Sequence, residues 1–408
     1  MIHEFKKIWK SYAIGLLWLM GIIWPLVGIH ADGTLSFANA FTLWLYIAAA
    51  SFVCLLLYVM NQSGSLKPVT TPLSAARSRV VATAGIVPTW FWILLALVLT
   101  GIFPVFTSRY AQDVAINVLI YICLGLGLNV VVGLAGMLDL GYIAFYGVGA
   151  YTYALLNIHF GMSFWLCLPI AAGLAMIAGC LIGYPTLRMR GDYLAIVTLG
   201  FGEIVRLILN NWMSLTNGPN GILGVKPPSI IIPTFDGGFG FELFVLKKLH
   251  FLYYIALALA VVTIIAVRHL NYSRIGRAWE SIREDETAAE LMGVNTFLLK
   301  LLAYGMGALF AGLAGAFFCA RMRFVSPESF TFLESAMVLS MVVLGGMGSI
   351  PGIILGAAAL IVLPEVFREF ELYRMLAFGM AMVVMMLFRP AGLIPAKRMG
   401  SRSEEREG

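Results

Sequence analysis

One stretch of this chain, residues 268–295, is a polar and highly charged interruption between apolar runs. It contains four arginines and five acidic residues between two long apolar runs, 251–267 and 296–318. An ionised group at the centre of a lipid bilayer costs several kcal/mol. The stretch must therefore lie in water at the ends of these runs, and its arginines favour the cytoplasmic side.

The same stretch has the spacing of a helix. Ala278, Ile282, Ala289 and Met292 recur at nearly helical intervals, and Gly293 stands where a helix would stop. We therefore expect a short amphipathic helix, displayed on the cytoplasmic surface as a docking element. The residues alone leave open a simpler interpretation, a basic connecting loop of the kind that polytopic membrane proteins need.

Few ionisable groups lie inside the apolar runs. Asp139 stands alone within residues 137–144, and a carboxylate at membrane depth suggests a function. It also borders a glycine-rich break, so it could instead lie hydrated at the cytoplasmic end of a helix. Glu203 and Arg206 are three residues apart, a helical spacing at which they could neutralise each other as a structural pair.

The composition determines the fold class. With 61% hydrophobic and only 12% charged residues, and a mean hydropathy of +0.91, the chain is not a soluble globule. Repeated apolar runs of about twenty residues predict an all-α polytopic membrane protein with about ten to twelve crossings, some of them discontinuous. The net charge of +6 reflects membrane topology, and no nucleic-acid partner is expected.

The chain divides into four predicted parts. Residues 1–60 form a transmembrane hairpin, 61–88 a cytoplasmic linker, 89–395 the core, which includes 268–295, and 396–408 a polar cytoplasmic tail. Both termini are expected in the cytoplasm, because basic residues accumulate there.

Glycines crowd two regions of the core, residues 125–149 and 345–356. Small residues at spacings of three and four allow helices to pack closely in lipid. Interrupted helices in corresponding places of two halves indicate a transport pathway instead. The sequence leaves both explanations open.

The chain carries no P-loop, since no glycine is followed by lysine. Energy from ATP must therefore come from a partner. The cysteines have no paired spacing and the histidines are scattered, so no metal, cofactor or catalytic site is predicted.

Several motifs resemble one family. Thr287-Ala288-Ala289, followed by Gly293, resembles the "EAA…G" loop of ABC-importer permeases, with Thr287 in place of the glutamate. The sequences GRAWE at 276–280 and REDE at 283–286 look like the LivM-type permeases of branched-chain amino acid importers (the LivM/BraE family). Segments 133–151, 190–203, 216–221 and 343–349 extend this similarity.

The resemblance implies three sets of site residues. The expected ATPase-coupling residues are Arg277, Glu280, Arg283, Glu284, Glu286, Thr287, Ala288, Ala289 and Gly293. The expected translocation pathway comprises Gly136, Asp139, Tyr142, Phe145, Tyr146, Gly147 and Gly346. The expected outer loop comprises Asn217, Gly218, Pro219, Asn220 and Gly221.

The resemblance also implies a function and partners. The chain is expected to be the permease subunit of a high-affinity ABC importer for leucine, isoleucine, valine or related amino acids, in the bacterial inner membrane. Its expected partners are a LivH-type permease, two cytoplasmic ABC ATPases that hydrolyse the ATP, an extracytoplasmic amino acid-binding protein and membrane lipid. The alternative is a stand-alone ion-coupled transporter or channel, which would need paired intramembrane charges.

Overall fold

The computed structural model describes residues 89–189, 191–234, 240–245, 248–366, 379 and 392–395. The predicted hairpin (1–60), linker (61–88) and tail (396–408) lie outside the described residues, as does nearly all of a further expected span, 375–388. The chain divides into two units, Met1–Val98 and Leu99–Gly408, and the second contains nearly all of the described structure.

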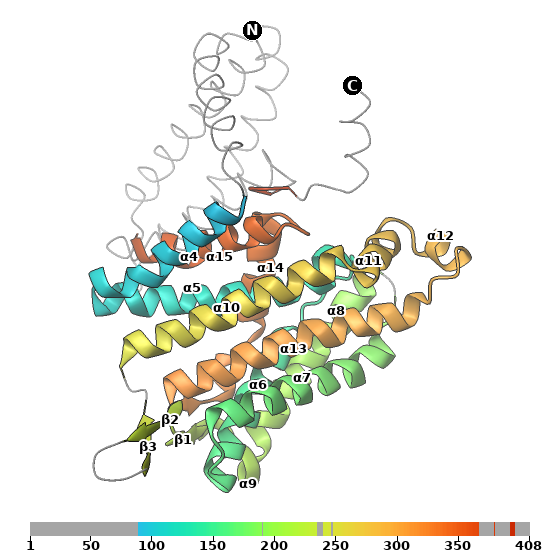
Figure 1. Cartoon of the computed structure of the whole chain (residues 1–408). Helices are drawn as coiled ribbons and strands as arrows, with labels where there is room; N and C mark the ends of the chain where they lie inside the picture. Colours follow the sequence, from blue (N-terminus) through green and yellow to red (C-terminus); the bar gives the residue numbers. More distant parts are fainter. Residues whose placement is uncertain are drawn as a thin grey trace, which may run out of the picture. The chain divides into compact units, whose positions relative to one another are not determined.

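Helices dominate the described part (Figure 1). In chain order, the elements are α4 Thr89–Phe106, α5 Arg109–Asn129, the π-helix η1 Val130–Leu134, α6 Ile143–Phe160, α7 Phe164–Thr186, α8 Asp192–Asn211, α9 Met213–Thr216, the 3-10 helix η2 Gly218–Asn220, β1 Ile222–Leu223, β2 Ser229–Thr234, β3 Gly240–Val245, α10 Leu249–Tyr272, α11 Arg274–Glu284, α12 Glu286–Leu291, α13 Thr296–Met322, β4 Phe324–Val325, η3 Pro327–Ser329, α14 Phe332–Gly345 and α15 Ile350–Val366.

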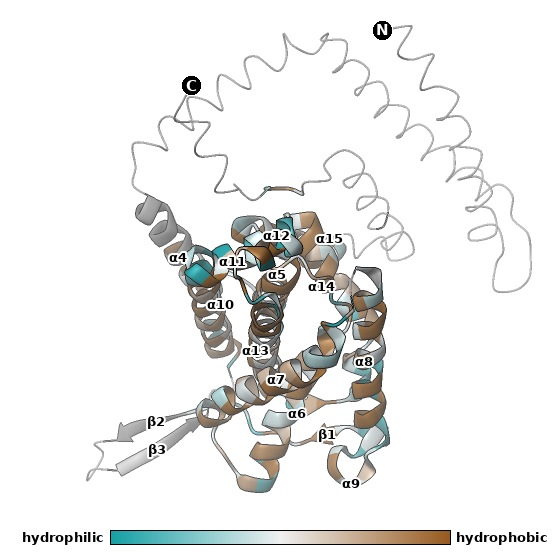
Figure 2. Ribbon diagram, turned by 90° about the vertical axis from the view of Figure 1, so that its right-hand side faces the viewer, coloured by the Kyte–Doolittle hydropathy of each residue, from teal (hydrophilic) through white to brown (hydrophobic). Residues whose placement is uncertain are grey.

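Six helical segments in the described part are long and apolar enough to cross a membrane. They start at Arg109, Phe164, Tyr193, Leu249, Thr296 and Pro327. Figure 2 shows these helices as mainly hydrophobic, whereas α11 and α12 are more hydrophilic. The predicted class, an all-α polytopic membrane protein, is confirmed. The expected total of ten to twelve crossings stays a prediction, because the N-terminal hairpin is not described.

Helix α13 is the centre of the bundle and packs against α5, α6 and α7. Its close contacts depend on glycines. A Cβ on Gly315 would overlap the carbonyl oxygen of Tyr146, and a Cβ on Gly312 would lie 2.9 Å from that of Ala171. Because backbones approach so closely here, the explanation of the glycines by tight helix packing is correct.

The helix interruptions on which the second explanation depends are present in both glycine-rich regions, whereas a transport pathway there stays a prediction. Helix α5 passes into the π-helix η1, and irregular backbone follows until α6. The apolar pattern predicts a helical span over residues 138–156, and its predicted start is wrong, because α6 begins at Ile143. The second break, at residues 346–349, separates α14 from α15. Each break contains glycines at positive φ, including Gly136 at 73° and Gly346 at 115°, which other residues adopt with difficulty.

The predicted outer loop is a compact turn. Asn217 adopts a φ of 60° and its Nδ2 donates to the carbonyl oxygen of Gly221 at 2.9 Å. Gly218 to Asn220 form η2, and β1 then pairs with β4 in antiparallel register, Ile222 opposite Val325. The turn therefore ties the segment after α9 to the segment after α13. Strands β2 and β3 form a separate hairpin that the sequence did not predict.

Candidate functional site

Helix α11 is anchored on the bundle by its apolar face. It begins at Ser273, whose Oγ accepts a hydrogen bond from the N–H of Gly276 at 3.1 Å. Trp279 and Ile282 are buried, and the indole Nε1 of Trp279 donates to the carbonyl oxygen of Leu299 at 2.7 Å. Because Leu299 belongs to α13, this contact fixes α11 to the central helix of the bundle.

The predicted single amphipathic helix is two helices. Asp285 is extended, with φ −154°, and its Oδ1 accepts hydrogen bonds from the N–H groups of Thr287 and Ala288 at 2.9 and 3.0 Å. Asp285 therefore ends α11 and caps the start of α12. Gly293, at φ 84°, follows α12 and its N–H donates to the carbonyl of Glu290 at 2.9 Å, as expected of a helix stop.

The expected ATPase-coupling residues face different surroundings. Arg277, Glu284, Thr287 and Ala288 are exposed, Glu280 is half-buried, and Gly293 is exposed. Ala289 is only 4% exposed and packs within the chain itself. Glu286 forms an ion pair with Lys300, with Oε1 and Nζ 2.6 Å apart. Glu286 directly precedes Thr287, which stands in place of the motif's glutamate, and its carboxylate thus holds α12 to α13.

The sequence missed the most exposed apolar residues of this element. Leu291 is 83% exposed and Met292 86%. The helical spacing grouped Met292 with Ala289, but the two residues differ in burial. Helix α12 ends at Leu291, so the helical spacing that would return Met292 to the face of Ala289 no longer applies.

Arg283 points inward from the same element. Its Nη1 donates a hydrogen bond to the carbonyl oxygen of Gly133 in η1. Its Cγ lies 2.7 Å from the place that a Cβ on Gly136 would occupy. One residue of the expected coupling set therefore contacts two residues of the first helix break, and Gly136 belongs to the expected pathway set.

The two helix breaks meet beside this contact. The buried Asn129, the last residue of α5, accepts a hydrogen bond on Oδ1 from the N–H of Gly348 at 2.8 Å. A Cβ on Gly133 would overlap this Oδ1 and lie 2.6 Å from Gly348 N. Among the residues that the structure describes, the Nδ2 of Asn129 has no hydrogen-bonding partner.

Asp139 is buried, at 1% exposure. Its Oδ1 accepts from the N–H of Gly141 at 2.9 Å, and the hydroxyl groups of Thr198 and Tyr304 lie beside the carboxylate. Within the described ranges, its Oδ2 has no hydrogen-bonding partner. The alternative that placed Asp139 in water at a helix end is therefore wrong for this chain on its own.

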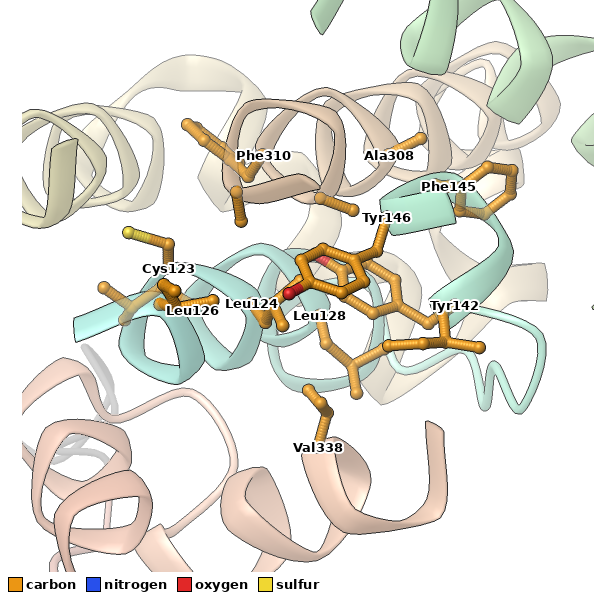
Figure 3. Packing of buried hydrophobic residues seen from close by; sticks show 14 of the residues in the cluster. Cys123, Leu124, Leu126, Leu128, Tyr142, Phe145, Tyr146, Ala308, Phe310 and Val338 are labelled. Atoms are coloured by element: carbon orange, nitrogen blue, oxygen red, sulfur yellow. The ribbon is translucent and has the colours of Figure 1, made fainter. Parts of the chain in front are cut away.

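The aromatic residues of the expected pathway lie in the core. Figure 3 shows Tyr142 and Tyr146 among apolar side chains such as Leu128 and Phe310. The hydroxyl of Tyr142 donates to the carbonyl of Gly307 at 3.1 Å. The rings of Phe145 and Tyr304 have centroids 5.5 Å apart. The ring of Tyr146 lies 5.3 Å from that of Phe318 and 5.5 Å from that of Phe330, centroid to centroid. Gly147 packs against the ring of Phe330. Their role in translocation stays a prediction.

A second group of charges lies towards the β4 end of α13. Arg321 contacts Asp113 Oδ1 at 2.6 Å and Asn117 Oδ1 at 2.5 Å through its guanidinium. Nearby, the hydroxyl of Tyr121 donates to Glu334 at 2.7 Å. These pairs could not be predicted from local patterns, because their members are more than 200 residues apart.

The predicted pair of Glu203 and Arg206 is confirmed. The Nε of Arg206 lies 2.8 Å from Glu203 Oε2, and both side chains are about one-third exposed. Each side chain therefore neutralises the charge of the other within α8, which is sufficient to explain two ionised groups in this apolar helix.

Comparisons with known proteins show which family the chain belongs to. The sequence model of a family described as "Branched-chain amino acid transport system / permease component" matches residues 110–388. The high-affinity branched-chain amino acid transport system permease protein LivM of Escherichia coli strain K12 is 50% identical over 319 residues, 75% of each chain. The corresponding LivH of Salmonella typhimurium is 25% identical, over 67% of this chain and 91% of its own. No solved structure matches the chain. The chain belongs to the family of permease components of branched-chain amino acid transport systems.

Proposed function

We propose that this chain is the membrane permease subunit of an ABC importer that carries branched-chain amino acids, such as leucine, isoleucine and valine, into the cytoplasm. The observation that carries the proposal is the α11–α12 element, in a chain that belongs to this permease family. The element is anchored to α13 by Trp279 and by the Glu286–Lys300 ion pair, yet it exposes Leu291 and Met292.

This element is the docking site for a partner ATPase. Exposed apolar side chains on a rigid, capped helix suit insertion into a cleft of a partner, where central apolar contacts contribute most of the binding free energy. The exposed Glu284 and Thr287 belong to the same element and can form the polar rim. Of the acidic residues expected to contact the ATPase, Glu284 is therefore the better candidate, because Glu286 is already paired with Lys300.

The complete transporter contains further subunits. Relatives of this chain include LivM and LivH permeases, which suggests that this chain pairs with a LivH-type permease. Two ATPases on the cytoplasmic side and an extracytoplasmic amino acid-binding protein complete the assembly. The arginines of 268–295 beside the membrane ends of α10 and α13 favour the cytoplasmic side for α11 and α12, and hence the bacterial inner membrane with both termini inside.

Reconstitution tests the function. The chain, its LivH-type partner and both ATPases are placed in vesicles, and uptake of leucine is followed with and without ATP and binding protein. We expect uptake only when both are present. Leucine uptake by this chain alone, driven by an ion gradient, would contradict the proposal.

Thiol labelling tests the orientation. Ser281, in α11, and Ser214, in α9, are both exposed at opposite ends of the described bundle. In intact cells an impermeant thiol reagent should label the Ser214→Cys variant and should label Ser281→Cys only after the cells are opened. The reverse pattern would contradict the orientation.

A further inference from the structure

We infer that Arg283 is the positioning residue that transmits movement of the α11–α12 element to the place where the two helix breaks meet. This inference rests on the proposed function, in which a partner ATPase moves that element. Arg283 connects the element to η1 through its hydrogen bond to the carbonyl of Gly133 and its contact with Gly136.

The π-helix makes the carbonyl of Gly133 available. In an uninterrupted α-helix, the N–H of Met137 would bond to the carbonyl of Gly133, four residues earlier. Here the N–H of Met137 bonds to Val131 O at 3.0 Å, and the N–H of Ala135 bonds to Val130 O at 3.2 Å. Gly133 therefore offers its carbonyl to a guanidinium from outside the helix.

Gly133 is also in contact with the second break. Because a Cβ at this position would overlap Asn129 Oδ1 and lie 2.6 Å from Gly348 N, no free space separates the three residues. A displacement of Gly133 must therefore change the hydrogen bond between Asn129 and Gly348, since close-packed interiors transmit strain. The spare Nδ2 donor of the buried Asn129 allows its amide to form a different hydrogen bond after such a movement.

The position of Arg283 on α11 suits this role. It follows Trp279 by four residues, so both side chains project from the same side of the helix. Trp279 holds α11 to α13, whereas Arg283 holds it to η1. Arg268 is also an exposed arginine, but it belongs to α10 and lies outside the α11–α12 element. A tilt of α11 against α13 would thus move the guanidinium of Arg283 and, with it, Gly133.

The test compares Arg283→Ala with the matched control Arg268→Ala in the complete reconstituted transporter. Leucine uptake and ATP hydrolysis are both measured, and their ratio is the readout. We expect Arg283→Ala to hydrolyse ATP while its uptake per ATP falls about tenfold, the effect of losing one hydrogen bond from a charged group. A purely structural role would lower both rates together and leave the ratio unchanged.

Hydrogen exchange provides a second readout that does not depend on transport by a variant. In the unaltered complete complex, the amides of residues 130–137 should change their exchange rate when ATP binds to the ATPases. The same change should be absent in Arg283→Ala. An exchange rate that does not respond to ATP in the unaltered complex, or responds equally in the variant, would overturn the inference.

The two proposals fail in different ways. If the unaltered complex imports no leucine, the proposed function is wrong. If it imports leucine and Arg283→Ala retains the uptake per ATP of Arg268→Ala, only the role of Arg283 is wrong.

Discussion

The two ends of the α13 bundle hold their arginines differently. Arg321, whose side chain is 5% exposed, is bound by the carboxylate of Asp113 and the amide of Asn117. Arg283 belongs to an exposed helix and bonds to the uncharged carbonyl of Gly133. Removing the partner of a buried charge is costly because the charge remains in a medium of low polarity. A partly hydrated guanidinium can instead exchange a carbonyl for water at small cost.

This difference indicates which end moves. The β4 end is held by charged side chains and by the β1–β4 pairing, which joins two distant segments. The α12 end is held by the buried Trp279, Ile282 and Ala289. It is also held by one partly exposed ion pair and by the contact of Arg283 with an uncharged carbonyl of η1. We expect the first end to act as a fixed base and the second as the part that changes position.

The largest effect is expected for Trp279→Ala. Removing a fully buried indole costs about 3–5 kcal/mol, because a cavity remains. Helix α11 should detach from α13, so that trypsin cleaves residues 274–283 rapidly in vesicles that expose this side. The control, Trp279→Phe, keeps most of the packing and loses the bond to Leu299, about 1 kcal/mol. Equal resistance of all three proteins would show that α11 is held by other contacts.

A smaller effect is expected for Asp113→Ala at the opposite end. It leaves Arg321 nearly buried with only Asn117 as a side-chain partner, which should cost about 2–3 kcal/mol; the 51% exposure of Asp113 limits the loss. The thermal unfolding midpoint of the purified subunit should fall, whereas uptake per ATP should not change. The exposed Glu328 offers the control Glu328→Ala. A change in uptake per ATP like that of Arg283→Ala would remove the distinction between the two ends.

The smallest effect is expected for Leu291→Ala. Because Leu291 is 83% exposed, the stability of the free subunit should not change. Binding of the partner ATPase should weaken by about 1–2 kcal/mol, roughly tenfold in Kd, measured by titration in detergent. Leu298→Ala removes another exposed leucine, from the first turn of α13, and should leave binding unaltered. If both variants bind equally well, Leu291 does not enter the ATPase.

The sequence was sufficient for the features that depend on local pattern. Apolar length predicted the membrane class, glycine crowding predicted both the close packing and the broken helices, and the three-residue spacing predicted the pair of Glu203 and Arg206. The stop at Gly293 also followed from local chemistry. Asp285 was a signal that could have been used, since aspartate often caps a helix, and it would have shown two helices in place of one.

The remaining features depend on residues far apart in the chain. The contact of Arg283 with Gly133 spans 150 residues. In the sequence, Arg283 looks like any other solvated arginine of a helix. Burial of Asp139 results from α8 and α13, which supply Thr198 and Tyr304. Such contacts become visible only when the helices are assembled.

The π-helix at Val130–Leu134 has an evolutionary consequence. A π-helical turn holds one residue more than an α-helical turn, so it is the structure that insertion of a single codon produces in an existing helix. Deleting one residue, such as Val132, would return this segment to α-helical spacing and shift the carbonyl of Gly133 by one position relative to Arg283. The acceptor that Arg283 uses could thus have been gained in one mutational step, and could be lost in one.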